Sequence, residues 1–134
     1  MTTTVSIIIP TRNRAASLPR AIESVLAQTY TDWELIVVND QSTDETAEVI
    51  AAYRAKDRRI QGVIGNREGS GLARNVGIRY SQGRYVAFLD DDDLWLPEKL
   101  AAQVEVVEQM PDVSLVFTDA SVMRGTDLER RASE

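Results

Sequence analysis

The 134-residue sequence predicts an α/β protein with a Rossmann-like, largely parallel sheet and helices on both faces. Two observations support this class: short apolar strands alternate with helical segments, and the strands lack the polar alternation of a half-exposed sheet. Right-handed crossovers join such strands, so their carboxyl ends meet at one edge. The length allows one domain with a real core, but is short for a complete enzyme with two substrates.

The first two predicted strands surround an amphipathic helix. Residues 5–9 and 35–38 are apolar, largely β-branched runs. Ser17 is the expected helix N-cap, and Pro19 lies in the first turn. Between the strands, apolar side chains recur at helical spacing, at Leu18, Ala21, Ile22, Val25 and Leu26.

The alternation continues through the rest of the chain. Ser42 and Glu45 have the spacing of a capping box for a second helix. The further expected elements are a helix over 43–55, a strand over 60–64, a helix over 71–81, a strand over 85–89, a helix over 97–109 and a last strand over 113–117.

Composition excludes several kinds of function. A net charge of -6 argues against nucleic acid as the main partner. Without cysteine there are no disulfides or thiolate metal sites, and without histidine there are no histidine-based triads or zinc sites. Acid–base chemistry must fall to carboxylates. No leader or membrane-spanning run is visible, so we expect a cytoplasmic location, either free or peripheral to a membrane in the full-length protein.

Four consecutive aspartates, Asp90 to Asp93, directly follow the apolar strand over 85–89. Two unit charges about 4 Å apart repel by about 1 kcal/mol in water and about 4 kcal/mol at an intermediate dielectric, so a cation is expected there. A hard divalent cation held by one or two carboxylates completes its shell with water and phosphate oxygens. The sequence therefore predicts a metal–phosphate site. The alternative is helix capping, which fits Asp93 alone.

Polar clusters follow three of the predicted strands. They are Pro10-Thr11-Arg12-Asn13, Asn39-Asp40-Gln41-Ser42 and Asp90 to Asp93. Ligands of open α/β sheets bind beyond the carboxyl ends of the strands. We therefore expect the three clusters to line one crevice.

Five stretches resemble, in order and spacing, those of the family 2 glycosyltransferases, which have the A-type glycosyltransferase fold. The matching stretches are 5–13 (VSIIIPTRN), 24–30 (SVLAQTY), 33–44 (WELIVVNDQSTD), 69–77 (GSGLARNVG) and 83–93 (GRYVAFLDDDD). No stretch is decisive by itself, but five in sequence are specific. The resemblance implies a truncated A-type fold that supplies the nucleotide-sugar-binding portion of such an enzyme.

The resemblance also implies a nucleotide site. Asp40 corresponds to the acidic residue that accepts a hydrogen bond from the base, commonly uracil, and Arg74 is placed near the nucleotide or diphosphate. Arg12 stands where the family often has an aromatic residue, so base stacking would fall to a guanidinium plane. The implied nucleotide-binding residues are Pro10, Thr11, Arg12, Asp40, Arg74, Asp90 and Asp91.

Simpler interpretations stay open for two of these residues. Asp40 is also placed to begin a turn capped by Ser42, and Arg74 to form an ion pair with the aspartate run.

Within the aspartate run, the D-x-D pattern of the family maps onto Asp90 and Asp92. The resemblance implies that Asp91 contacts ribose and that Asp92, with Asp90 as partner, binds Mn²⁺ or Mg²⁺ bridging the two phosphates. Repetition leaves the register open by one residue. The cation would stabilise the leaving nucleoside diphosphate.

The implied function is metal-dependent, inverting transfer from a nucleoside-diphosphate sugar, commonly a UDP-sugar, to a saccharide or lipid-linked acceptor of unknown identity. The catalytic residues stay unassigned, because the general base is expected beyond Glu134, in the acceptor-binding half. We expect residues 5–122 to form the donor-binding domain, incomplete or inactive alone, and residues 123–134 to be poorly ordered.

Two other functions stay open. An aspartate-nucleophile, phosphatase-like hydrolase also has a strand followed by D-x-D, but Leu94 stands where that class has Thr or Val, and Asp40 is left unexplained. The second is a non-catalytic nucleotide-binding module. A dinucleotide fingerprint at 69–74 is excluded, because Arg74 occupies the place of its third glycine.

Overall fold

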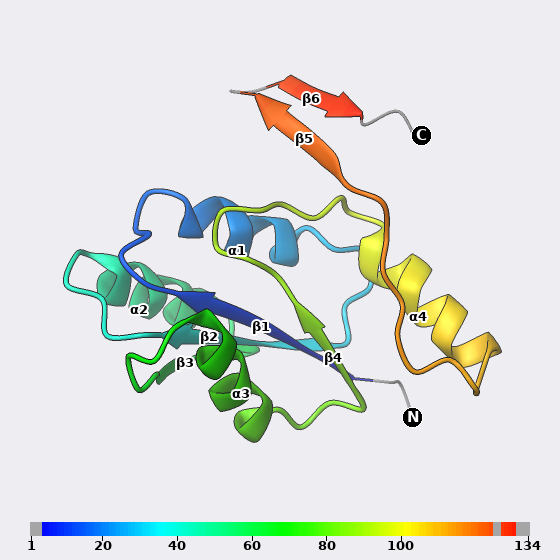
Figure 1. Cartoon of the computed structure of the whole chain (residues 1–134), viewed down its shortest axis with the longest axis horizontal. Coiled ribbons are helices and arrows are strands. Elements are labelled where there is room, and N and C mark those ends of the chain that lie inside the picture. The colour runs from blue at the N-terminus through cyan, green and yellow to red at the C-terminus, as the bar shows by residue number, and fades with distance from the viewer. Residues whose placement is uncertain (1–3, 125–126, 131–134) are drawn as a thin grey trace.

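The computed structural model describes residues 4–124 and 127–130, and it is built around one parallel sheet (Figure 1). Strands β1 to β4 form this sheet in the order β3-β2-β1-β4, and β5 and β6 form an antiparallel pair. The elements are β1 Val5–Thr11, α1 Leu18–Leu26, β2 Trp33–Asn39, α2 Thr46–Lys56, β3 Ile60–Ile64, α3 Ser70–Tyr80, β4 Tyr85–Phe88, α4 Lys99–Gln109, β5 Ser121–Arg124 and β6 Asp127–Arg130. The α/β class predicted from the sequence is confirmed.

The central strand, β1, is buried along its whole length. It pairs in parallel with β2, from Val5 beside Trp33 to Thr11 beside Asn39, and with β4 on its other side. Covering both faces of a strand requires an uninterrupted apolar run, which residues 7–9 supply. Because β1 and β2 pair residue by residue up to Thr11 and Asn39, the two strands end side by side at the same edge of the sheet.

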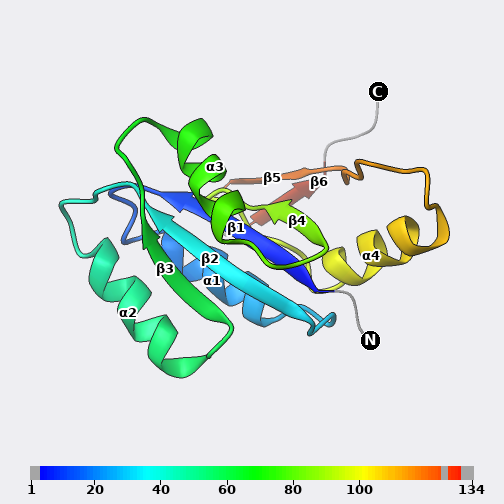
Figure 2. The ribbon, with the colours of Figure 1, turned by 90° about the horizontal axis from the view of Figure 1, so that it is seen from below.

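Helices cover both faces of the sheet, as predicted (Figure 2). On one face, Ile7, Ile9, Leu35 and Val37 pack in a core that includes the buried side chains of α1 and α2. On the other face, Ile8, Ile36 and Val38 pack against Ala73 and Val76 of α3. The odd and even residues of each strand thus serve different layers.

The strand predicted over 113–117 is wrong, because residues 113–120 adopt no regular structure. Leu115 and Phe117 are 78% and 86% exposed. A strand needs a partner for its backbone groups. In the described part of the chain β4 pairs only with β1, so this apolar run lies beside no strand.

Strands β5 and β6 pair from Ser121 with Arg130 to Arg124 with Asp127. Of the tail expected to be poorly ordered over 123–134, residues 125, 126 and 131–134 lie outside the described residues. No helix in the described ranges has both the length and the apolar character needed to cross a membrane.

The helix starts show which capping predictions fail. Ser17 is the N-cap of α1 as expected, although its hydroxyl makes no capping hydrogen bond. The capping box of Ser42 and Glu45 does not form, since α2 begins at Thr46 and the carboxylate of Asp44 accepts from the Thr46 backbone N–H at 3.0 Å. The Ser42 hydroxyl instead accepts a hydrogen bond from the Asn13 backbone N–H, in the loop that follows β1.

Helix α3 approaches β1 closely at Gly77. A Cβ atom at this position would lie 2.5 Å from Cγ2 of Ile8, in the core between the helix and the sheet. We expect Gly77→Ala to lower the free energy of unfolding by about 1–3 kcal/mol, because overpacking forces the helix and the strand apart. The loss is measurable by urea denaturation.

Gly71→Ala is the matched control on the same helix, because a Cβ atom there meets nothing within 4 Å. It should leave stability unchanged or raise it by up to about 1 kcal/mol. Equal effects of the two substitutions would contradict the close approach at Gly77.

Candidate functional site

A cleft of about 330 Å³ opens where the carboxyl ends of β1, β2 and β4 meet the start of α3. Its volume is at the lower end of the range usual for small-molecule sites. It is lined by Pro10, Thr11, Arg12, Arg14, Asp40, Gly69, Ser70, Ala73, Arg74, Asp90, Asp91 and Asp92. Members of all three predicted polar clusters line the cleft, although the second cluster contributes Asp40 alone.

Every residue proposed from the sequence for the nucleotide or the metal lines this cleft. Sequence reasoning missed Arg14, Gly69, Ser70 and Ala73 as lining residues. The available signal for Arg14 was its place on the same loop as Arg12, two residues along. For Gly69, whose φ is 95°, it was the glycine directly before a helix.

The Asp40 side chain is buried, with 5% of its surface exposed. Its Oδ1 atom accepts a hydrogen bond from the Arg67 backbone N–H at 2.6 Å, and Oδ2 accepts from the Gly69 N–H at 3.3 Å. Gly65 passes so close that a Cβ atom there would lie 2.6 Å from Oδ1. Asp40 therefore holds the loop between β3 and α3 at the cleft, and its remaining lone pairs are available to a ligand.

The alternative interpretation of Asp40, as the first residue of a turn capped by Ser42, does not hold. The turn is closed by Asn39, whose Oδ1 atom accepts from the Ser42 backbone N–H at 3.0 Å. The Asp40 backbone N–H donates to the Thr11 carbonyl at 2.9 Å, which extends the pairing of β1 and β2 into the site.

Arg74 forms an ion pair with Asp90, with 2.8 Å between a guanidinium nitrogen and Oδ1. The side chains are 34% and 52% exposed, so the pair contributes only about 0–1 kcal/mol. The ion-pair alternative for Arg74 is therefore present. Both side chains line the cleft.

The Asp91 side chain is half-buried and interacts with the end of β1. Burial raises the pKa of this carboxyl, and the nearby charge of Asp92 adds to the rise. The Thr11 hydroxyl, the Arg14 guanidinium and the Arg12 backbone amide act in the opposite direction on this pKa. Asp91 is thus the member of the run in contact with the loop after β1.

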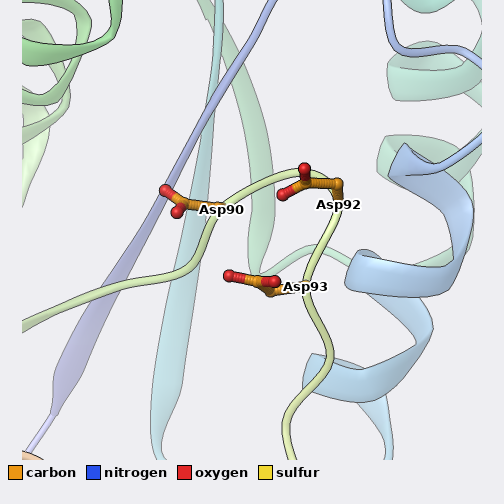
Figure 3. Close-up of side chains that lie close together, drawn as sticks. All are labelled: Asp90, Asp92 and Asp93. Carbon is orange, nitrogen blue, oxygen red and sulfur yellow. The ribbon is translucent and has the colours of Figure 1, made fainter. Parts of the chain in front are cut away.

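The carboxylates of the other three aspartates, Asp90, Asp92 and Asp93, lie close together on the loop after β4 (Figure 3). One oxygen from each of Asp90, Asp92 and Asp93 lies within 4.8 Å of the others, and all three residues are exposed. Oxygen ligands at this spacing suit a hard divalent cation such as Mg²⁺ or Mn²⁺. The predicted pair, Asp90 and Asp92, belongs to this carboxylate cluster.

The prediction that Asp93 caps a helix is wrong. Helix α4 begins at Lys99 with Glu98 as its N-cap, and the Asp93 backbone N–H donates to the Asp90 carbonyl at 3.1 Å in a turn. Residues 91–98 contain no helix: Asp91 and Asp92 lie in a turn, residues 93–96 have no regular structure, and Pro97 and Glu98 form the turn that precedes α4.

Gln28 fastens the segment that follows the aspartates, a role that sequence reasoning missed. Its side chain is buried, donates to the Leu96 carbonyl at 2.8 Å and accepts from the Leu100 N–H at 3.1 Å. The aspartate loop is thereby anchored to the end of α1. The sequence signal for this anchoring role was a glutamine within the stretch 24–30, just after an amphipathic helix.

Comparison with known proteins identifies the family. The family model described as "Glycosyl transferase family 2" matches residues 6–133. A curated relative, the putative teichuronic acid biosynthesis glycosyltransferase TuaG of Bacillus subtilis, is 39% identical over 129 residues, which is 94% of this chain and 51% of TuaG. The chain belongs to glycosyl transferase family 2.

Solved glycosyltransferase structures share the fold. S. aureus TarS 1–349 in complex with UDP-GlcNAc superposes with a TM-score of 0.73 and 28% sequence identity, over 79% of this chain and 31% of that one. The mannosyltransferase PcManGT from Pyrobaculum calidifontis, in complex with GDP-Man and Mn²⁺, gives 0.70 and 27%, over 77% and 32%. The predicted A-type fold is confirmed, and the chain spans about half of TuaG and about a third of each solved chain. The phosphatase-like alternative is not favoured.

The crowding of the aspartates should make stability depend on pH. Burial, followed by the charges of Asp92, Asp90 and Asp91, raises the pKa of Asp93 above its ordinary value of 3.8. A carboxyl with a raised folded-state pKa favours folding below 3.8 and loses that contribution as the pH rises through the folded-state pKa. With a chelator present, Asp93→Asn should raise the urea midpoint at about pH 7, and the gain should vanish on approach to 3.8.

Asp112→Asn, which removes the same charge from an exposed position outside the run, is the control for the loss of one negative charge. A constant difference between wild type and Asp93→Asn at every pH would contradict the electrostatic origin.

Proposed function

We propose that this chain is the donor-binding part of a glycosyltransferase, in which residues 5–122 form the nucleotide-sugar-binding domain. The observation that carries the proposal is the composition of the cleft. It brings together an acceptor for a base N–H, a weakly paired guanidinium and a cluster of three carboxylates. These are the groups that a base, a diphosphate and a divalent cation require.

The nucleotide is proposed to lie along the carboxyl ends of the strands. Asp40 accepts from the base beside Pro10, Thr11 and Arg12, and Asp91 contacts the ribose. Arg74 binds the diphosphate after releasing Asp90. The backbone contacts that bury Asp40 support its part, since they fix the carboxylate before a ligand arrives.

UDP is the proposed nucleotide, because TarS is described in complex with UDP-GlcNAc and a carboxylate is a good acceptor for the N–H of uracil. The description of PcManGT in complex with GDP-Man makes guanine the natural competitor in any binding test.

The cation, Mn²⁺ or Mg²⁺, is proposed to be held by Asp92 with Asp90. The cluster fits this group because it offers only oxygen ligands on one exposed side of a loop, where waters and phosphate oxygens can complete the shell. When bound, the cation would neutralise charge that develops on the leaving diphosphate. Asp91 faces the loop after β1 instead, which supports separate roles for neighbouring aspartates.

The transfer is proposed to be inverting, with a saccharide or lipid-linked acceptor and a general base beyond Glu134. The location of the general base is supported by the late carboxylates Asp112 and Asp119, which are exposed and do not line the cleft. The 134-residue chain by itself is then expected to bind donor but transfer little or no sugar.

Metal-dependent nucleotide binding tests this proposal. We expect the wild-type chain to bind UDP at least about tenfold more tightly with Mn²⁺ than with a chelator, by isothermal titration calorimetry. Asp92→Ala should abolish the effect of Mn²⁺ and leave the metal-free affinity unchanged, because its carboxylate acts through the cation. GDP in place of UDP tests the base preference.

Asp112→Ala is the control, since it removes an equally exposed carboxylate that does not line the cleft. Wild-type binding of UDP that is indifferent to Mn²⁺ and Mg²⁺ would refute the metal assignment, and no binding of any nucleoside diphosphate would refute the function. Tight binding without sugar transfer, even in the presence of the rest of the protein, would favour a non-catalytic nucleotide-binding module.

A further inference from the structure

The loops that follow β1 and β2 are joined by a network of hydrogen bonds centred on Asn13. The backbone of Asn13 has a φ of 52°, in the left-handed region that asparagine tolerates better than most residues. Its backbone N–H donates to the Ser42 hydroxyl at 2.9 Å. Its Oδ1 atom accepts from the Thr43 backbone N–H at 2.7 Å and from the Asp44 N–H at 3.3 Å.

Further contacts fasten the same two loops. The Ala15 backbone N–H donates to Asp44 Oδ2 at 3.2 Å, and the Arg14 N–H donates to the Thr46 hydroxyl at 3.3 Å. Three successive residues after Arg12 are therefore held through their backbone N–H groups, two by side chains of the loop after β2 and one by Thr46, the first residue of α2. Residues 13–15 are attached by specific hydrogen bonds rather than by apolar packing.

The turn at Asn13 affects the cleft through the two residues next to Asn13 in the chain. Arg12 and Arg14, on either side of it, both line the cleft, whereas Asn13 does not. The Arg14 guanidinium is close enough to lower the pKa of Asp91, against the stronger effect of burial. Arg74, the third cleft arginine, is paired with Asp90. The charge that the loop after β1 brings to the cleft thus depends on the conformation of this turn.

We propose that Asn13 is a positioning residue: its side-chain oxygen locks the turn that directs Arg14 into the cleft, so that the anionic ligand meets a fixed cation. This rests on the proposed function. Fixing the backbone before binding removes an ordering cost from the affinity. Asn13 touches no ligand and acts through Arg14. The side-chain N–H₂ of Asn13 donates no hydrogen bond in this network, so only its oxygen is required.

Two substitutions at Asn13 separate the oxygen from the backbone shape. Asn13→Gly keeps access to the left-handed region and removes the acceptor, and Asn13→Asp keeps both. By calorimetric titration of UDP with Mn²⁺, we expect Asn13→Gly to weaken affinity about three- to tenfold and Asn13→Asp to stay within about twofold of wild type. Urea denaturation of the same samples reports whether each variant is folded.

A double-mutant cycle with Arg14→Gln provides a measurement that a purely structural role would not move. If Asn13 acts through Arg14, the loss caused by Asn13→Gly should largely disappear when Arg14 is already replaced. Equal losses in both backgrounds would overturn the positioning role. Should Asn13→Gly fail to fold, Ser42→Ala tests the turn through its other contact, since it removes the acceptor of the Asn13 backbone N–H. Its loss of affinity should also largely disappear when Arg14 is already replaced, and equal losses in both backgrounds would overturn the positioning role.

The two proposals fail in different ways. If wild type binds UDP and Asn13→Gly binds it equally well, the positioning role is refuted and the donor-binding function stands. If wild type binds no nucleotide, the function is refuted, and the positioning role with it.

Discussion

The structure depends on the parallel pairing of β1 with β2 on one side and β4 on the other. Ile7, Ile8 and Ile9 are fully buried in the middle of this arrangement, and burying each side chain contributes roughly 1.5–3 kcal/mol. The pairing extends past the last regular residue of β4, because the Leu89 N–H donates to the Ile8 carbonyl at 3.0 Å. The packing of the apolar core and this hydrogen bond thereby fix the position of the next residue, Asp90.

That placement has an electrostatic cost, which the fold offsets only in part. Arg74 is paired with Asp90, and the positive charge and polar groups of the loop after β1 act on Asp91. For Asp93, burial and then the charges of the neighbouring aspartates raise the pKa, and no basic group is among the causes of that shift. Helix capping does not account for the arrangement, because α4 begins at Lys99 with Glu98 as its N-cap. The uncompensated charge is what a bound cation would relieve.

The parts that sequence could predict are those governed by local pattern. The β-branched runs of β1 and β2 and the apolar spacing of α1 define their own elements, and parallel connections bring the strand ends together. The predicted strand over 113–117 failed because an apolar run becomes a strand only beside a partner. The capping box at Ser42 and Glu45 failed for a related reason. Asn13 competes for that loop from 29 to 31 residues away, which no local spacing reveals.

The candidate site also has parts that local sequence predicts and parts that depend on tertiary packing. Asp40 and the aspartates lie directly after strands and could be placed in advance, whereas the loop contacts of Asp40 and the anchoring by Gln28 depend on tertiary packing. Arg14 lies in a loop whose direction is set by the left-handed turn at Asn13, so its place on the same loop as Arg12 indicated a residue near the cleft but did not establish that Arg14 enters it.

The central claim is that one nucleoside diphosphate lies between Asp40, which binds its base directly, and the aspartate cluster, which binds its diphosphate through a cation. A crystal structure with UDP and Mn²⁺, with the anomalous signal of manganese measured, tests it most directly. The claim predicts an anomalous peak within coordination distance of an Asp92 oxygen and of the diphosphate, about 2.0–2.3 Å, with the base against Asp40. Manganese bound away from the aspartates, or UDP ordered in the cleft with no manganese beside it, would contradict the claim.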